Sequence, residues 1–295
     1  MLKGAMTALV TPFRDGRIDE DALRRHIDYQ IENGIHGLVP CGTTGEASTL
    51  SHDEHIDVVR ITVEQVAGRV PVVAGSGSNS TSEALELTRR VKDTGADACL
   101  MITPYYNKPT QEGLYQHYRH VAGNVDIPVI LYNVPGRTGV NLLPETVGRL
   151  AEVPNIVGLK DATGDLKQAS YTLELVPDDF VLFSGEDTLV YSLMSLGGHG
   201  VISVTSNVAP REMSDMVTAH LSGDPTAARD LHFRLLPLCD ALFVETNPIP
   251  VKGALAMMDR IVNELRLPLV PLSDNAVPGV RKALEAFGID VAQGN

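Results

Sequence analysis

The chain has 295 residues, of which 43% are hydrophobic and 21% are charged, a composition typical of a folded globular protein. The 24 Lys and Arg residues against 37 Asp and Glu residues give a net charge of −13, which argues against binding to nucleic acids or anionic membranes. Three widely spaced cysteines, Cys41, Cys99 and Cys239, form no paired motif, as is typical of a reducing compartment.

The chain begins with a short apolar stretch that is followed directly by Pro12, Arg14 and Asp15. This stretch is too short to favour a secretory signal, and no later run approaches the roughly 20 apolar residues of a membrane-spanning helix. We therefore expect a buried first strand and a cytoplasmic protein.

Short runs rich in Val, Ile and Leu recur along the chain with little polar alternation, as is typical of parallel strands buried on both faces. The predicted strands are Ala5–Val10, Ile35–Val39, Val70–Ala74, Ala98–Ile102, Pro128–Asn133, Ile156–Lys160, Val181–Ser184 and Gly200–Val204. Amphipathic stretches between them predict helices, among them Ile18–Asn33, Ser51–Ala67, Thr81–Thr94 and Thr110–Ala122.

Several helix ends carry boundary signals. Ser51 with Glu54, and Ser80 with Glu83, have the spacing of a capping box. Gly34 and Gly95 follow predicted helices and are expected to be C-caps.

Eight strand–helix units in about 220 residues predict a (β/α)8 barrel. A doubly wound open sheet is the alternative, but the G-x-G-x-x-G turn expected after its first strand is missing. Beyond residue 223 three further helical stretches follow, Ala227–Leu236, Val251–Leu265 and Val277–Phe287. We predict a catalytic barrel over residues 1–223 and a C-terminal helical region over residues 224–295.

The active site of such a barrel lies at the C-terminal ends of its strands. His36 and His199 precede strands, so we expect them at the opposite end as turn or packing residues. Of the seven lysines, only Lys160 ends a predicted buried strand. Desolvation at the barrel mouth favours its neutral amine, a nucleophile suited to Schiff-base chemistry. An ion pair with Asp161 is the alternative, which is weakened because adjacent strand residues point to opposite faces.

Other polar groups follow the predicted strands at the same end. Thr43 and Thr44 lie on a glycine-flanked turn whose hydroxyl and N–H groups could hold a carboxylate, unless it is a plain turn. Tyr106 and Tyr132 could relay protons or simply pack. Arg137 lies in a stiff loop, where its guanidinium suggests recognition of a substrate carboxylate.

A metal site is disfavoured. His52 and His55 do not form an H-E-x-x-H motif, and no Asp, Glu and His cluster recurs at the other strand ends.

Five motifs in this order resemble those of the dihydrodipicolinate synthase family, the lysine-dependent (class I) pyruvate aldolases related to N-acetylneuraminate lyase. They are Gly42–Glu46, Thr103–Tyr106, Tyr132–Gly139, Lys160–Asp165 and Asn247–Lys252, and the resemblance spans nearly the whole chain. It implies condensation of pyruvate with L-aspartate 4-semialdehyde to 4-hydroxy-tetrahydrodipicolinate, on the route to lysine and diaminopimelate, without a metal or organic cofactor.

The resemblance also implies residue roles. The implied catalytic residues are Lys160, Tyr132, Thr43 and Tyr106, and the implied substrate-binding residues are Thr44, Arg137, Gly185 and Ile202. Lys160 would form the Schiff base, and Tyr132 would shuttle protons with Thr43 and with a Tyr106 donated by a neighbouring subunit. Thr44 would hold the pyruvate carboxylate and Arg137 the carboxylate of the second substrate. Gly185 and Ile202 would line the pyruvate pocket through their backbone.

The resemblance further implies a homotetramer built as a dimer of dimers. In family members inhibited by L-lysine, the effector pocket at the dimer interface matches Ser48, His52, His55, Asn79, Glu83 and Tyr105 of this chain. The alternative is that these residues are only helix caps and polar groups of an interface.

Three alternative functions remain open from the sequence. The first is a sister aldolase acting on a sugar-derived 2-keto acid, although the sialate lyases lack an arginine in the loop of Arg137. The others are a metal-dependent aldolase and a catalytically silent barrel. Lys160, Tyr132 and Thr43 together argue against the silent barrel.

Overall fold

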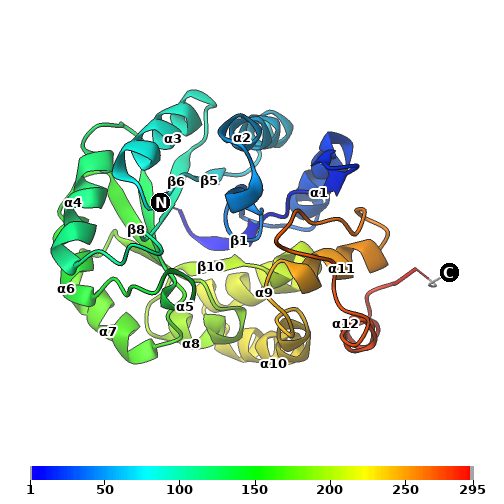
Figure 1. Ribbon diagram of the computed structural model, residues 1–295. Coiled ribbons are helices and arrows are strands. Elements are labelled where there is room, and N and C mark those ends of the chain that lie inside the picture. The colour runs from blue at the N-terminus through cyan, green and yellow to red at the C-terminus, as the bar shows by residue number, and fades with distance from the viewer. Residues whose placement is uncertain (1, 293–295) are drawn as a thin grey trace.

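Eight parallel strands form the central sheet of the protein, which is described here over residues 2–292 of a computed structural model (Figure 1). The strands are β1 (Gly4–Ala8), β4 (Gly37–Val39), β5 (Val73–Gly75), β6 (Ala98–Ile102), β7 (Val129–Asn133), β8 (Ile156–Asp161), β9 (Val181–Ser184) and β10 (Gly200–Ser203). Their order is β4-β1-β10-β9-β8-β7-β6-β5, and a parallel bridge between Leu38 and Val72 links the two ends of the sheet. The predicted barrel is thus confirmed and the open sheet is wrong.

One helix follows each strand and lies in the ring outside the barrel (Figure 1). These helices are α1 (Glu20–Glu32), α2 (His52–Val66), α3 (Thr81–Asp93), α4 (Gln111–Ala122), α6 (Pro144–Ala151), α7 (Leu166–Leu175), α8 (Val190–Ser195) and α9 (Pro210–Leu221). Shorter elements lie in the loops: the hairpin β2 (Phe13–Arg14) and β3 (Arg17–Ile18), the helix α5 (Pro135–Thr138), and the 3₁₀ turns η1 (Ala47–Thr49), η2 (Asp187–Leu189) and η3 (Thr205–Asn207). None of the helices described is long and apolar enough to cross a membrane.

The alternation of strand side chains produces two apolar clusters. One fills the barrel and includes Met6, Val39, Ile130, Tyr132, Phe183 and Ile202. The other, much larger, lies between the strands and the helices and includes Leu38, Cys99, Leu131 and Leu159. Both faces of the strands are therefore buried, which explains why the strands read as continuous apolar runs.

The helix-end predictions are confirmed in part. The Ser51–Glu54 capping box is present at the start of α2, and Gly34 and Gly95 take left-handed φ angles of 82° and 86° after their helices. The second predicted capping box is wrong, because Ser80 makes no side-chain cap. Its intended partner, Glu83, instead accepts a hydrogen bond from the Ser78 hydroxyl.

The C-terminal region contains α10 (Pro225–Ala241), α11 (Ile249–Met257) and α12 (Val277–Phe287), with α10 packed on both α9 and α12 (Figure 1). The helix predicted over 251–265 ends early, at Met257. Asp259, two residues further on, takes a left-handed φ of 54° that an α-helix does not accommodate. The division of the chain at residue 223 into a barrel and a C-terminal helical region stays a prediction. Residue 1 of the first region and residues 293–295 of the second lie outside the described residues.

Candidate active site

Lys160 is the last residue but one of β8, and its side chain lies inside the barrel. It pairs in register with Tyr132 on β7 and with Phe183 on β9, and both of these side chains belong to the barrel-filling cluster. The Lys160 side chain is buried, and its Nζ lies 4.4 Å from the centroid of the Tyr132 ring. A primary amine is therefore held beside a phenol in a site largely shielded from water.

Asp161 does not compete for this amine. Its register partners are Asn133 and Ser184, which lie on the outer face of the strands. Its Oδ1 accepts hydrogen bonds from the N–H and the hydroxyl of Thr163, at 2.8 and 2.6 Å. Both residues belong to the described part of the chain and no ion pair joins them, so that alternative is wrong.

Gly185 makes room for the lysine. A Cβ atom at this position would lie 3.0 Å from Cε of Lys160 and 2.7 Å from Cβ of Ala162, so a larger residue would displace the amine. On the next strand Ile202 is fully buried inside the barrel, where it pairs in register with Met6. Gly185 therefore lies next to the Lys160 side chain, and Ile202 lies inside the barrel.

Two acids that the sequence analysis did not single out follow β9. Asp187 is buried, and its Oδ2 accepts hydrogen bonds from the N–H groups of Val204 and Thr205, at 3.1 and 2.7 Å. Burial raises the pKa of both Glu186 and Asp187, and the positive charge of Lys160 opposes that rise. In the sequence, the signal that could have pointed to these two acids is their position directly after a predicted strand. Asp187 ties the loop after β9 to the end of β10.

The turn after β4 is pressed against the neighbouring strand. A Cβ on Gly75 would lie 1.9 Å from the carbonyl oxygen of Cys41, so the backbone of β5 approaches the start of the turn as only glycine allows. Thr44 is buried, and its Oγ1 accepts a hydrogen bond of 2.9 Å from Nδ2 of Asn247. Thr43 is partly exposed and faces the cavity.

A cavity of about 490 Å³ opens beside this turn and is lined by Thr43, Tyr132, Arg137 and Asn247, among others. The Arg137 side chain is exposed overall, and its Nη2 donates a hydrogen bond of 3.1 Å to the carbonyl oxygen of Asn247. A cation, hydroxyl groups and a phenol thus converge on one cavity, a set of groups suited to an anionic carbonyl substrate.

The same cavity reaches most of the predicted effector residues. Ser48, His52, His55, Glu83 and Tyr105 line it. His52 Nε2 lies 3.2 Å from Oε1 of Glu83, and the buried His55 ring donates a 2.7 Å hydrogen bond to the carbonyl oxygen of Gly75. Asn79 does not line the cavity, but its Nδ2 donates to the Tyr105 carbonyl oxygen at 3.1 Å.

Tyr106 is the one predicted catalytic residue that this single chain does not bring to the site. It is 87% exposed and has a left-handed φ of 72°. Its N–H donates to the carbonyl oxygen of Thr138 at 3.3 Å, while its phenol points away from the barrel core. This backbone conformation is uncommon for a non-glycine residue.

The two histidines assigned to the far end of the barrel lie there. His36 Nδ1 accepts a hydrogen bond from the Ala5 N–H at 3.1 Å, and His199 Nδ1 accepts one from the Leu182 N–H at 3.2 Å. Both rings thus bind backbone at strand starts, as predicted.

A buried ion pair joins two of the motifs. Lys252 and Glu46 are fully buried, with Nζ 2.5 Å from Oε1, and Nζ also donates to the Thr11 carbonyl oxygen at 2.9 Å. Burial lowers the pKa of Lys252, and the Glu46 carboxylate opposes this effect. In the sequence Lys252 falls in a predicted helical stretch, and no spacing indicates Glu46 as its partner.

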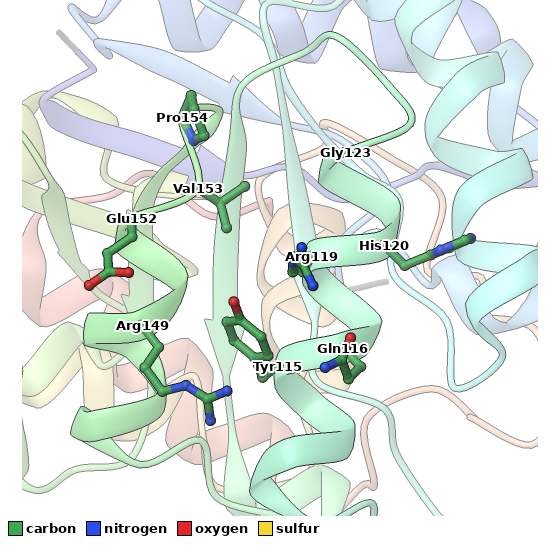
Figure 2. A pocket seen from close by; sticks show the side chains of 9 residues that line it. All are labelled: Tyr115, Gln116, Arg119, His120, Gly123, Arg149, Glu152, Val153 and Pro154. Carbon is green, nitrogen blue, oxygen red and sulfur yellow. The ribbon is translucent and has the colours of Figure 1, made fainter.

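A second hollow, of about 500 Å³, lies outside the barrel between α4 and α6 (Figure 2). Its polar side chains do not converge, since His120 and Glu152 point away in opposite directions (Figure 2). Arg149 is engaged by Glu112 at 2.9 Å and lies 3.9 Å from the centroid of the Tyr115 ring. The barrel mouth is the better candidate for chemistry.

Comparisons with known proteins agree with this geometry. The model of the dihydrodipicolinate synthetase family matches residues 1–287. A 4-hydroxy-tetrahydrodipicolinate synthase of Nitratidesulfovibrio vulgaris is 60% identical over 287 residues, which cover 97% of this chain and 98% of that protein. The crystal structure of dihydrodipicolinate synthase from Thermotoga maritima superposes with a TM-score of 0.96 at 48% identity, covering 98% and 99% of the two chains. The lysine-bound enzyme from Cyanidioschyzon merolae superposes with a TM-score of 0.95 at 42% identity, covering 97% and 98%.

Proposed function

This chain belongs to the dihydrodipicolinate synthetase family, and from that premise we propose that it condenses pyruvate with L-aspartate 4-semialdehyde to form 4-hydroxy-tetrahydrodipicolinate in lysine and diaminopimelate biosynthesis. The observation that carries the proposal is the Lys160 amine, buried in the barrel mouth 4.4 Å from the Tyr132 ring centroid. The sister aldolase acting on a sugar-derived 2-keto acid is not favoured, because relatives of 55–60% identity bear the synthase name.

The reaction begins at Lys160. Its neutral amine attacks the ketone carbon of pyruvate, and the adduct loses water to give a Schiff base. The methyl carbon then loses a proton, and the resulting enamine attacks the aldehyde carbon of the second substrate to form the new C–C bond. The amino group of that substrate finally attacks the imine carbon, which closes the ring and releases Lys160 as the free amine. Because the protonated Schiff base accepts the electron pair, the scheme uses no metal or organic cofactor.

Tyr132 would carry protons in these steps. It is a buried phenol that pairs with Lys160 in the strand register, with its ring centroid 4.4 Å from the amine nitrogen. Thr43 lines the same cavity and would extend the relay toward the mouth. The carboxylate of pyruvate would bind the Thr44 hydroxyl and nearby N–H groups, and Arg137 would bind the carboxylate of the semialdehyde.

We further propose that the protein is a homotetramer built as a dimer of dimers, in which Tyr106 completes the relay of a neighbouring subunit. The exposure and the left-handed backbone of Tyr106 support this role. A phenol held in a strained conformation, with no hydrogen-bond partner among residues 2–292, is suited to an intersubunit site.

L-lysine is the proposed inhibitor. A relative that shares the fold was crystallised with lysine bound. In this chain Glu83 could bind the ammonium group of the ligand, and His52 could bind its carboxylate. Because these residues line the same cavity as Tyr132 and Arg137, an effector there would lie close to the substrates. We also propose a cytoplasmic location, which the three buried free cysteines support.

A substrate panel tests the proposed function. Pyruvate is paired with aspartate semialdehyde or with aldehydes that lack a carboxylate, and product formation is followed in a coupled assay. We expect turnover with aspartate semialdehyde and a large loss in Arg137→Met, mainly through the KM of the aldehyde. Equal or faster turnover with sugar-derived aldehydes would contradict the assignment.

A further inference from the structure

Two motifs that lie far apart in the sequence meet beside the cavity, which Asn247 lines and behind which Thr44 is buried. Asn247 precedes α11 and Thr44 follows β4, and the Asn247 Nδ2 donates a 2.9 Å hydrogen bond to Oγ1 of Thr44 across a separation of 203 residues. Both side chains are buried, at 5% and 2% exposure. A hydrogen bond in such a site is well shielded from competing water.

The direction of this hydrogen bond constrains the threonine hydroxyl. A hydroxyl has one hydrogen to donate and two lone pairs to accept, and one of those lone pairs is used by the Asn247 amide. Among residues 2–292, no hydrogen bond donated by the Thr44 hydroxyl is found. Its hydrogen is therefore not committed to another group of the described chain and is free to be donated to a bound carboxylate oxygen.

The main chain of the same residue holds the second proposed anchor. The carbonyl oxygen of Asn247 accepts the 3.1 Å hydrogen bond from Nη2 of Arg137. The segment itself is fixed to the turn by the fully buried Lys252–Glu46 pair. Asn247 thus contacts one group proposed for each substrate, through its side chain for Thr44 and through its backbone for Arg137.

We propose that Asn247 is a positioning residue that orients the Thr44 hydroxyl toward the carboxylate of pyruvate. The inference rests on the proposed function, because it assumes that Thr44 binds this carboxylate. Substituting the side chain removes the amide donor but leaves the backbone carbonyl that holds Arg137. The loss is therefore confined to the first substrate.

Steady-state kinetics with both substrates test the proposal. Asn247→Ala should raise the KM of pyruvate about tenfold, because the Thr44 hydroxyl can still bind the carboxylate but is no longer held in one orientation. The KM of aspartate semialdehyde should stay within about twofold of the wild-type value, because the substitution leaves the contact of Arg137 with the backbone intact. Asn124→Ala is the matched control, because this exposed amide donates only to the His120 carbonyl oxygen.

Asn247→Asp, which keeps the size of the side chain, serves if the alanine variant folds poorly. An aspartate can only accept, so it would draw the Thr44 hydrogen toward itself and place a negative charge beside the bound carboxylate. The KM of pyruvate should rise more in this variant than in Asn247→Ala. A smaller rise would overturn the proposal.

A double-mutant cycle gives the decisive result. Thr44→Val removes the hydroxyl, so Asn247→Ala should change the KM of pyruvate by less than about twofold in that background if the two act as one unit. Additive effects, or equal rises in the KM of both substrates, would overturn the positioning role. If the wild-type protein turns over no pyruvate, the proposed function fails. If it does and Asn247→Ala matches the wild type, only the positioning role fails.

Discussion

Lys160 and Tyr132 lie side by side on adjacent strands, with the amine nitrogen 4.4 Å from the phenol ring centroid. The parallel register of β7 and β8 creates this relationship, because paired residues point to the same face of the sheet. The barrel interior is filled by apolar side chains below them, so the two groups sit at its mouth, where substrate can reach them.

Tyr132→Phe tests the proton relay. The substitution removes the hydroxyl and keeps the ring that packs in the barrel, so the fold should be preserved. We expect kcat to fall about 10²–10⁴-fold, the usual contribution of a positioned proton donor or acceptor. Steady-state assays measure the loss, and an unchanged thermal midpoint serves as the control. A wild-type kcat would eliminate the relay through this residue.

Mixed dimers test whether Tyr106 acts in the neighbouring subunit. Lys160→Ala and Tyr106→Phe are each expected to be nearly inactive. If Tyr106 is donated across the interface, a hybrid dimer of the two variants has one complete site. Random remixing should then restore about a quarter of the wild-type activity, because half of the dimers are hybrids and each has one working site of two.

The same mixture also tests the alternative, in which Tyr106 acts in the site of its own chain. If Tyr106 served its own chain, each hybrid would contain one site without the amine and one without the phenol. Activity would then stay at the mean of the two variants after remixing. Self-mixed samples of each variant are the control.

The buried Lys252–Glu46 pair is expected to be costly to break singly. Glu46→Gln leaves a buried ammonium without its counter-ion, and Lys252→Met leaves a buried carboxylate, each costing about 3–5 kcal/mol of the free energy of unfolding. Urea unfolding measures this cost. The double variant should lose less than the sum of the two. Single variants as stable as the wild type would show that the pair does not hold the motifs together.

Acid should destabilise the protein through two buried histidines. Burial lowers the pKa of His26 and His117 from an ordinary 6.5 to about 4. Between these values the unfolded chain binds protons that the folded chain does not. Their contribution is therefore complete above pH 6.5 and is lost as the pH falls toward 4, at up to about 1.4 kcal/mol per pH unit for each histidine.

Urea unfolding at pH 7, 6 and 5 measures this slope. His26→Gln and His117→Gln should each flatten it, even where they lower stability overall, whereas the exposed His120→Gln should flatten it far less, because burial lowers the pKa of His117 more than the neighbouring His120 does. The account of these histidines would be wrong if all three variants kept the wild-type slope.

Much of the fold could be predicted because strands buried on both faces leave a simple pattern. The run Ala98–Ile102 coincides with β6, and Ile156–Lys160 differs from β8 by one residue. The errors come from local competition that periodicity does not reveal. The backbone of Asp259 turns left-handed and ends a helix early, and Ser78 binds the carboxylate expected to cap α3.

The candidate site could be predicted only where residue type and strand end coincide. Lys160 could be identified because a lysine is unusual at the end of a buried apolar strand, which suggests a functional role. The contact between Asn247 and Thr44, and the pair of Lys252 with Glu46, join residues more than 200 positions apart. Such contacts depend on how the C-terminal helices pack on the barrel, and no local spacing encodes them.

Trapping with borohydride tests the central claim most directly. Borohydride reduces a Schiff base to a stable secondary amine, so the wild-type protein incubated with pyruvate should gain one covalent adduct per chain. Peptide mass spectrometry should place this adduct on Lys160, and Lys160→Ala should gain none. An unmodified Lys160, or an adduct on another lysine, would contradict the account.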